Sequence, residues 1–260
     1  MKNKLKLVKN LLEKRSARKK EGLFVIEGPH LIEEAGDRVK FYFYCENLPI
    51  VKKLEEGGSI GYKLSRKQFT ELSQVEAPQG IIAVVRDLEF SLNDVLTNHP
   101  TIQSSNNPSL IIYCIGVQDP GNLGTIIRTA DALGATGIIL SKGTVDLYNP
   151  KVVRSTQGSI FHLPIVIVED DQETIEQLKQ KNVKIIVSDI KASRESFSAD
   201  LTGPIAFLIG NEGAGLPGGI FELADEMVKI PMPGRAESLN AGISAGILLY
   251  EALRQRNSGR

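Results

Sequence analysis

Short, uninterrupted runs of apolar residues recur through the second half of the chain and limit its possible folds more than any other feature. Between Leu110 and Met232 these runs are LIIYCIGV, GIILS, LPIVIV, VKIIVSDI, PIAFLIG and EMVKIPM. Strands that are apolar on both faces are typical of a parallel sheet covered by helices on both sides. Residues 122–133 and 238–256 have helical spacing of apolar residues. The sequence therefore predicts an α/β fold with a parallel sheet.

The first half of the chain also alternates between strands and helices. Its predicted strands are LFVIEG, VKFYFYC, IGYKLS and GIIAVVRD, and short helical stretches separate them. Residues 97–109, TNHPTIQSSNNPS, are rich in Asn, Ser and Pro and lack periodicity, as linkers do. We therefore predict a domain over residues 1–100, a linker over 101–109 and a second domain over 110–260.

The charge of the chain is balanced overall but uneven at its start. With 31 Lys+Arg and 31 Asp+Glu, the net charge is zero. Residues 1–20 nevertheless contain one acid, Glu13, and apolar residues at helical spacing between many cations: Lys2, Lys4, Lys6, Lys9, Lys14, Arg15, Arg18, Lys19 and Lys20. This pattern predicts a basic amphipathic helix. Two interpretations stay open, a solvated face of a docked helix and a surface that contacts phosphates.

Cysteine and histidine usage argues against disulfides and metals. Cys45 and Cys114 lie in apolar runs and are predicted to be buried, reduced thiols. The three scattered histidines do not have metal-ligand spacing. No apolar run reaches the roughly 18 residues that span a bilayer, and the basic N-terminus lacks the apolar core of a secretory signal. We expect a cytoplasmic protein with no metal and no membrane partner.

Three loop-rich segments follow apolar strands in the second half, and ligands bind at the carboxyl ends of strands in parallel sheets. In the first segment, residues 116–135, Asn122 is predicted to cap the following helix. Arg128 lies about two turns later, at the edge of the apolar face. It is either a surface arginine paired with an acid or a residue of the site.

The second segment, FLIGNEGAGLPGG, contains five glycines and one charged residue, Glu212. Residues 213–218 formally match the G-x-G-x-x-G pattern of dinucleotide-binding proteins. However, Pro217 lies inside the match, and the next strand does not end in an acid that could hold a ribose. A nucleotide-linked dehydrogenase is therefore a weak alternative.

The third segment, residues 228–256, contains the last predicted helix, with Ser238 as its cap and Asn240 in its first turn. An apolar stripe is predicted to face the core: Leu239, Ile243, Ile247, Tyr250 and Leu253. Gly242 and Gly246 each cost a helix interior about 1 kcal/mol relative to Ala. Together with small neighbours they predict close packing on another element or a second subunit.

These segments resemble the three motifs of the SpoU/TrmH RNA ribose 2'-O-methyltransferases, which belong to the SPOUT class. The motifs appear in order as DPGNLGTIIRTADALGA, LIGNEGAGLP and IPMPGRAESLNAGISAGILLYE, and the resemblance covers about residues 110–256. NPKVVRSTQGSIFHLPI, residues 149–165, resembles the corresponding stretch of members that act on ribosomal RNA. The N-terminal half, with RSARKKEGLFVIEG and EAPQGIIAVV, is similar to the small substrate-binding domain of such enzymes, which resembles a ribosomal protein.

The resemblance implies a C-terminal knot, a homodimer and S-adenosylmethionine as methyl donor. It implies that Gly210, Ile230 and Leu239 hold the donor. It also implies a reaction site formed by Asn122, Arg128, Glu212, Ser238 and Asn240. Because the pKa of arginine lies above about 12, we expect Arg128 to hold the adjacent phosphate and the developing alkoxide rather than to abstract the proton.

The expected reaction is 2'-O-ribose methylation of RNA, since DNA lacks the 2'-hydroxyl. The separate N-terminal domain and residues 149–165 favour ribosomal RNA over transfer RNA. One alternative is a transfer RNA 2'-O-methyltransferase. Another is a non-catalytic RNA-binding or ribosome-assembly factor that uses a methyltransferase fold without its activity. The intact motif residues argue against such a loss of activity.

Overall fold

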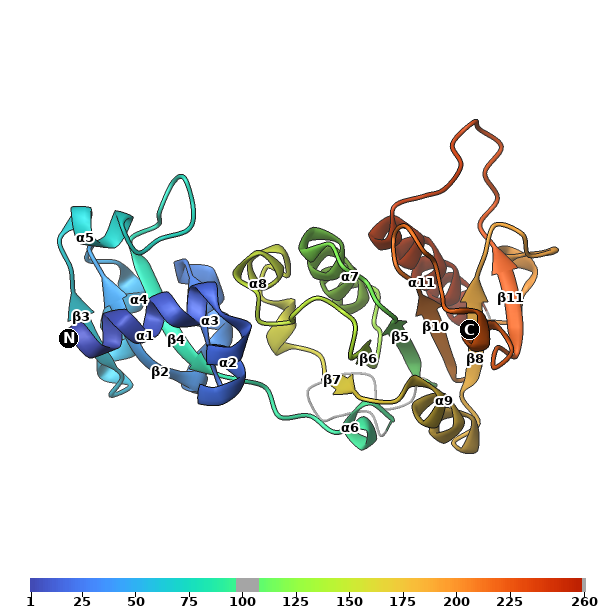
Figure 1. Cartoon of the computed structure of the whole chain (residues 1–260), viewed down its shortest axis with the longest axis horizontal. Helices are drawn as coiled ribbons and strands as arrows, with labels where there is room; N and C mark the ends of the chain where they lie inside the picture. The colour runs from blue at the N-terminus through green and yellow to red at the C-terminus, as the bar shows by residue number, and fades with distance from the viewer. Residues whose placement is uncertain (97–107, 259–260) are drawn as a thin grey trace. The chain divides into compact units, whose positions relative to one another are not determined.

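The computed structural model describes residues 1–96 and 108–258, and the chain forms two compact units (Figure 1). The first unit comprises Met1–Leu88 together with Asp146–Phe161. The second comprises Glu89–Val145 and His162–Arg260. Residues 101–107 of the predicted linker lie outside the described residues, so the linker stays a prediction. The first unit takes in a segment from the second half of the sequence, which the predicted boundaries did not anticipate.

The first unit has a four-stranded mixed sheet in the order β1-β4-β2-β3. Its strands are β1 (Leu23–Glu27), β2 (Val39–Tyr44), β3 (Ile60–Lys63) and β4 (Ile81–Arg86). β4 is antiparallel to β1 and β2, whereas β2 and β3 are parallel. The helices of this unit are α1 (Lys2–Glu13), α2 (Arg15–Glu21), α3 (Pro29–Ala35), α4 (Pro49–Glu56), α5 (Arg66–Thr70) and α8 (Pro150–Ser155), with 3-10 turns at Gly36–Arg38 and Ser159–Phe161.

The basic N-terminal segment forms two helices rather than one, because Lys14 is extended, with φ −122° and ψ 116°. The buried guanidinium of Arg18 stabilises this break. It donates to the carbonyls of Leu11 and Leu12, which α1 leaves unpaired at its C-terminal end. Its Nε also donates to Asp146 at 2.7 Å. The prediction of one continuous helix over residues 1–20 is therefore wrong.

Asp146–Phe161 packs on β1 through aromatic rings. The ring of Phe24 stacks on Tyr148 with centroids 4.5 Å apart and lies 6.2 Å from Phe161. The hydroxyl of Tyr148 accepts from the backbone N–H of Leu88 at 2.7 Å. Because of these contacts, Asp146–Phe161 belongs to the first unit, although the residues before and after it in the sequence belong to the second.

The second unit has a seven-stranded sheet in the order β7-β6-β5-β10-β8-β11-β9, and every pairing in it is parallel. The strands are β5 (Leu110–Cys114), β6 (Gly137–Ser141), β7 (Ile165–Val168), β8 (Lys184–Ser188), β9 (Arg194–Glu195), β10 (Ile205–Ile209) and β11 (Glu226–Lys229). The predicted α/β fold with a parallel sheet is confirmed. In this order β10 lies between β5 and β8, so the carboxyl ends of these strands meet at one edge of the sheet.

Five helices and a 3-10 turn complete the described part of the second unit. They are α6 (Leu92–Leu96), α7 (Pro120–Ala132), α9 (Asp171–Gln180), α10 (Gly218–Phe221), α11 (Ala241–Ser258) and a turn at Ser196–Ser198. A core under the sheet joins apolar side chains of β5, β8 and β10 to α9 and α10, among them Tyr113, Val187, Leu208 and Leu178. The knot implied by the family resemblance stays a prediction.

The apolar stripe predicted on the last helix faces outward. Ile243, Ile247 and Tyr250 are 55%, 37% and 60% exposed. The buried face of α11 consists instead of smaller residues and two leucines: Gly242, Ala245, Leu248, Leu249 and Ala252. The prediction that the stripe faces the core is therefore wrong for these three residues, because the glycine-containing face makes the closer approach, whereas Leu239 and Leu253 are partly buried.

Gly242 and Gly246 let α11 approach α7 closely. A Cβ atom at residue 242 would lie 3.0 Å from Cγ2 of Thr125, and one at residue 246 would lie 3.3 Å from Cγ2 of Thr129. The close packing predicted from these glycines is thus confirmed for another element of the same chain.

The C-terminal end of α11 is fixed by its polar side chains. The guanidinium of Arg256 donates to the backbone carbonyls of Pro108, Ser109, Leu201 and Gly203. Gln255 adds bonds to the N–H of Leu201 and the carbonyl of Ala199. Burial lowers the pKa of Arg256 to about 10. The guanidinium therefore joins the last helix to the segments that precede β5 and β10.

The two thiols differ in their surroundings. Cys114 is buried in β5, and burial raises its pKa, so it stays protonated. Cys45 is half-buried, which corrects the expectation that both thiols are buried. Both are free of disulfides, as predicted.

Candidate active site

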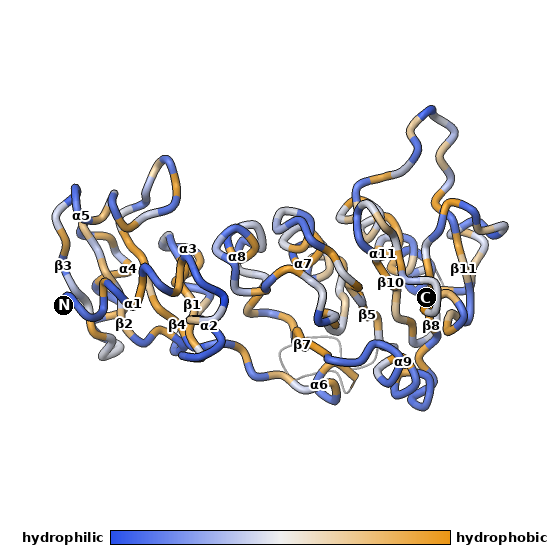
Figure 2. The backbone as a smooth tube through the Cα atoms, viewed as in Figure 1, coloured by the Kyte–Doolittle hydropathy of each residue, from blue (hydrophilic) through white to orange (hydrophobic). Residues whose placement is uncertain are grey.

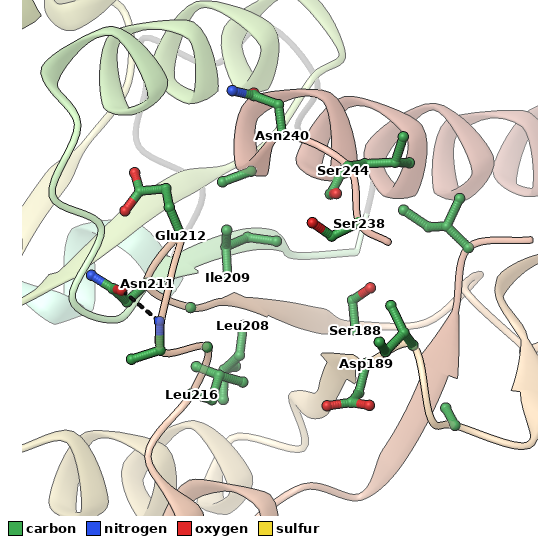
Figure 3. A pocket seen from close by; sticks show the side chains of 18 of the residues that line it. Ser188, Asp189, Leu208, Ile209, Asn211, Glu212, Leu216, Ser238, Asn240 and Ser244 are labelled. Atoms are coloured by element: carbon green, nitrogen blue, oxygen red, sulfur yellow. Dashed lines mark hydrogen bonds between the residues drawn. The ribbon is translucent and has the colours of Figure 1, made fainter. Parts of the chain in front are cut away.

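A pocket of about 1000 Å³ opens at the carboxyl ends of β8, β10 and β11 (Figure 3). Its walls come from the ends of these strands, the loop after β10, the segment before α11 and the first turn of α7. This is the edge of the sheet at which ligand sites of parallel α/β folds are found. A volume of this size accommodates a nucleoside-sized ligand.

The loop after β10 is shaped by Asn211. Its Oδ1 accepts from the N–H groups of Gly213 and Ala214 at 2.9 Å, and its Nδ2 donates to the carbonyl of Gly116 at 2.9 Å. A Cβ atom at residue 210 would lie 2.6 Å from the backbone of Gly215. Only glycine therefore fits at residue 210, where the loop folds back on itself.

A chain of amide hydrogen bonds joins the three predicted motifs. Nδ2 of Asn240 donates to Oδ1 of Asn122 at 2.7 Å, and Nδ2 of Asn122 donates to Oε1 of Glu212 at 2.9 Å. The three residues lie before α11, in the first turn of α7 and after β10. The fold thus brings segments that are far apart in sequence to one point at the pocket.

The carboxylate of Glu212 accepts hydrogen bonds from the turn that precedes α7. It accepts from the backbone N–H groups of Gln118 and Asp119, both at 3.1 Å, and from Asn122. Burial by itself would raise the pKa of Glu212, but these hydrogen bonds outweigh it and lower the pKa below its ordinary value. The lowered pKa favours an ionised Glu212 at neutral pH, and its carboxylate holds the turn before α7 in place.

Two predicted helix caps are wrong. Asp119 caps α7 by accepting from the N–H of Asn122 at 2.8 Å, so Asn122 is not the cap. Asn240 caps α11 by accepting from the N–H of Gly242 at 2.9 Å, so neither Ser238 as cap nor Asn240 inside the first turn is correct. In both cases, the residue that the sequence assigned to capping lines the pocket instead.

Seven of the eight predicted site residues line the pocket: Asn122, Gly210, Glu212, Ile230, Ser238, Leu239 and Asn240. Arg128 does not line it. Its side chain is exposed on α7 and makes no ion pair or hydrogen bond within residues 1–96 and 108–258. The interpretation of Arg128 as a surface arginine paired with an acid is therefore wrong for the single chain.

Ser188 and Asp189 also line the pocket, and sequence reasoning missed both. Ser188 lies across the pocket from Ser238 (Figure 3). One carboxylate oxygen of Asp189 accepts from the N–H of Lys191 at 2.6 Å. Ser188 is the last residue of β8 and Asp189 follows it directly, so the rule that ligands bind at the carboxyl ends of parallel strands would have found both had it been applied to VKIIVSDI.

The residues at the pocket fit an organic cofactor better than a metal. The walls combine apolar side chains with hydroxyls, amides and the carboxylate of Asp189, a mixture typical of small-molecule sites. Within the described residues, no three His, Cys, Asp or Glu side chains cluster so that they could hold a metal ion. No helix in the same residues is long and apolar enough to cross a bilayer.

Comparison with known proteins agrees with this fold. Residues 109–250 match the model of the SpoU rRNA Methylase family, and residues 2–83 match that of the MRM3-like substrate binding domain. The chain therefore belongs to the SpoU rRNA methylase family. The resemblance identified from the three motifs is confirmed.

Individual relatives span nearly the whole chain. A 23S rRNA (guanosine(2553)-2'-O)-methyltransferase of Bacillus subtilis is 35% identical over 242 residues, which are 92% of each protein. The SpoU methyltransferase AviRb of Streptomyces viridochromogenes, solved in complex with AdoMet, has a TM-score of 0.88 at 33% identity and covers 99% of both chains. A TrmH/SpoU tRNA modifying enzyme of A. aeolicus has a TM-score of 0.55 at 29% identity and covers 61% of this chain and 81% of its own.

Proposed function

We propose that this chain transfers the methyl group of S-adenosylmethionine to a ribose 2'-hydroxyl of ribosomal RNA. One observation carries the proposal: the Asn240–Asn122–Glu212 chain joins three motif segments at the mouth of a nucleoside-sized pocket. Family membership and the AdoMet complex of a similar structure support the donor. Gly210, Ile230 and Leu239 are the proposed donor contacts.

Bound S-adenosylmethionine supplies a methyl group that its sulfonium already activates, so the protein needs no covalent nucleophile. The protein instead has to orient the acceptor hydroxyl and stabilise the charge that develops on its oxygen. Asn122 and Asn240 are held by their mutual hydrogen bond, and Glu212 keeps the turn before α7 in place. Ser238, whose hydroxyl makes no hydrogen bond within the described residues, is available to contact the ribose.

Arg128 and the exposed side of α11 support a homodimer. Ile243, Ile247 and Tyr250 form an apolar surface on α11, which packs beside the helix that carries Arg128. A second copy that covers this surface would remove the three side chains from water and place Arg128 near a substrate held at a subunit interface. There its guanidinium would hold a phosphate of the RNA and the developing alkoxide.

Ribosomal RNA is the preferred substrate over transfer RNA. The relative aligned over 92% of this chain is a 23S rRNA enzyme, whereas the tRNA-modifying structure covers 61%. The match of residues 2–83 to a substrate binding domain adds a second surface for RNA. With such a substrate, we place the reaction in the cytoplasm and expect it to need neither a metal nor a membrane.

Mapping 2'-O-methyl groups on total RNA from cells with and without this protein tests the proposal. We expect one ribose of ribosomal RNA to lose its methyl group when the protein is absent. A lost methyl group in transfer RNA instead would identify the transfer RNA alternative. Unchanged methylation, together with no calorimetric binding of S-adenosylhomocysteine, would favour a non-catalytic RNA-binding or assembly factor.

A further inference from the structure

The outer side of α1 and α2 carries a dense set of cations that the proposed site does not use. Most of the basic residues of these two helices are exposed, and Figure 2 shows the hydrophilic run along them. We call the exposed set the α1–α2 surface: Lys2, Lys6, Lys9, Lys14, Arg15, Lys19 and Lys20. None of these side chains forms an ion pair with any residue that the structure describes, so their charges are available to a partner.

The structure separates these cations from two others that have internal roles. The ammonium of Lys4 lies 4.0 Å from the ring centroid of Phe41 and 5.5 Å from that of Tyr62. Arg18 is 6% exposed and binds Asp146 and the end of α1. Lys4 and Arg18 therefore stabilise the unit, and they could not be distinguished from the other cations by sequence alone.

The backbone beneath the α1–α2 surface is held in place on both sides of its break. Arg18 links the end of α1 to Asp146, and Lys4 rests on the sheet through Phe41. The cations therefore project from a fixed backbone, which lowers the entropy lost when they meet a row of negative charges.

The apolar side of α1 distinguishes between an anionic membrane and a nucleic acid as the partner. Val8 and Leu11 are 0% and 1% exposed and pack against the core of the four-stranded sheet. A basic amphipathic helix that binds a membrane inserts its apolar face between the lipids, and here that face is already buried. The partner is therefore a polyanion that needs charge contacts alone, as the phosphates of a nucleic acid do.

We propose that the α1–α2 surface binds the phosphate backbone of the RNA substrate independently of base sequence. The choice of RNA rests on the proposed function, whereas the location of the surface rests on the free cations and the buried apolar side. Contacts to phosphates position a nucleic acid without reading its sequence. The pocket of the second unit would then select the ribose.

Salt-dependent binding of a structured RNA hairpin to the full chain tests the proposal. The paired variants K6Q/K9Q and K19Q/K20Q each remove two free cations. The matched control is K52Q/K53Q in the same unit, because Lys52 and Lys53 are exposed but already paired with Glu56 and Glu33. Calorimetric binding of S-adenosylhomocysteine checks that each variant keeps its pocket.

We expect each of the first two variants to flatten the plot of log affinity against log salt by about 0.7 to 0.9 for every phosphate that the surface no longer neutralises. The control is expected to leave the slope unchanged, and K6R/K9R is expected to retain it. Equal slopes for the unmodified protein and both paired variants would overturn the proposal. So would a failure of the unmodified protein to bind the hairpin, or binding to phosphatidylglycerol vesicles that the same substitutions abolish.

The two proposals fail in distinguishable ways. RNA binding with the expected slopes but no methyl transfer would contradict the proposed function and leave the α1–α2 surface intact. Normal methyl transfer in both paired variants, with an unchanged salt slope and an unchanged KM for RNA, would contradict RNA binding by the α1–α2 surface. The proposed function would still hold.

Discussion

The side-chain amide of Asn240 has two roles at one position: its Oδ1 caps α11 and its Nδ2 donates to Oδ1 of Asn122 at 2.7 Å. The side chain of Asn240 thereby links the start of α11 to the start of α7. Removing the whole side chain of residue 240 would therefore affect both the stability of α11 and the placement of Asn122.

Asn240→Asp separates these two roles. Aspartate keeps the oxygen that caps α11 but replaces the donor to Asn122 with a second acceptor. We expect Tm to stay close to that of the unmodified chain while kcat falls at least ten-fold. Asn240→Ala loses the cap as well, at a further cost of about 1 kcal/mol in unfolding free energy. Equal kcat for Asn240→Asp and the unmodified protein would contradict a role in placing Asn122.

Glu212→Gln is expected to change how stability depends on pH. Because hydrogen bonds lower the pKa of Glu212 in the folded chain, its stabilising contribution is present above its ordinary pKa of 4.5 and is lost as pH falls through the lower folded value. The variant should therefore be less stable than the unmodified protein at pH 7, and the difference should shrink below pH 4.5.

Thermal unfolding of both proteins at several pH values measures this difference. If the two proteins differed in Tm by the same amount at neutral and acidic pH, the ionised carboxylate of Glu212 would contribute nothing to stability. Because the pKa of Glu212 is lowered from 4.5, we also expect that its titration causes none of the pH dependence of the rate above pH 6.

Gly242→Ala should destabilise the chain although alanine favours helices. Its Cβ atom would lie 3.0 Å from Cγ2 of Thr125, so α7 and α11 would have to move apart. Overpacking of this kind costs about 1 to 3 kcal/mol and outweighs the gain in helix propensity. The double variant Thr125→Ser with Gly242→Ala removes the crowded methyl group and should recover most of the loss in urea unfolding. No recovery would argue that the strain lies elsewhere.

Arg256→Met should unfold at lower urea concentration than the unmodified chain. Four buried or half-buried carbonyls lose the guanidinium that binds them, which we expect to cost about 3 kcal/mol. Arg254→Gln is the matched control, because Arg254 is half-exposed and pairs with Glu251 within the same helix. Solvent screens such a partly exposed pair, so it contributes little to stability. Equal losses for the two variants would contradict an anchoring role for Arg256.

Arg128→Ala should abolish methyl transfer while S-adenosylhomocysteine still binds with unchanged affinity, because Arg128 lies outside the donor pocket. Mixing this variant with an excess of Asn240→Asp, for which a low kcat is expected, tests whether the site is shared between subunits. We expect activity above that of either variant in the mixed dimers, because each proposed site uses Arg128 of one chain and Asn240 of the other. Loss of donor binding in Arg128→Ala would refute the assigned role.

Several features of the site were accessible from sequence because they are local. Strand-end loops of a parallel sheet meet at one edge, and the motif resemblance selects Gly210, Glu212 and Ser238 within them; all three line the pocket, and their roles stay predictions. Ser188 and Asp189 followed the same rule and were missed because no motif marked them. Asn122 and Asn240 were identified as site residues but were given the wrong local roles, since several polar residues near a helix start compete for the cap.

The sequence by itself determined the α/β class, the parallel sheet and the family, because hydrophobic periodicity and short motifs are properties of neighbouring residues. The tertiary structure alone decided which face of α11 is buried, that Asp146–Phe161 packs with the first unit, and that Lys4 and Arg18 are not free cations. Each of these depends on contacts between residues far apart in the chain. The stripe of large apolar residues on α11 shows the physical reason: periodicity reveals that a face avoids water, but not whether the chain itself or a second molecule covers it.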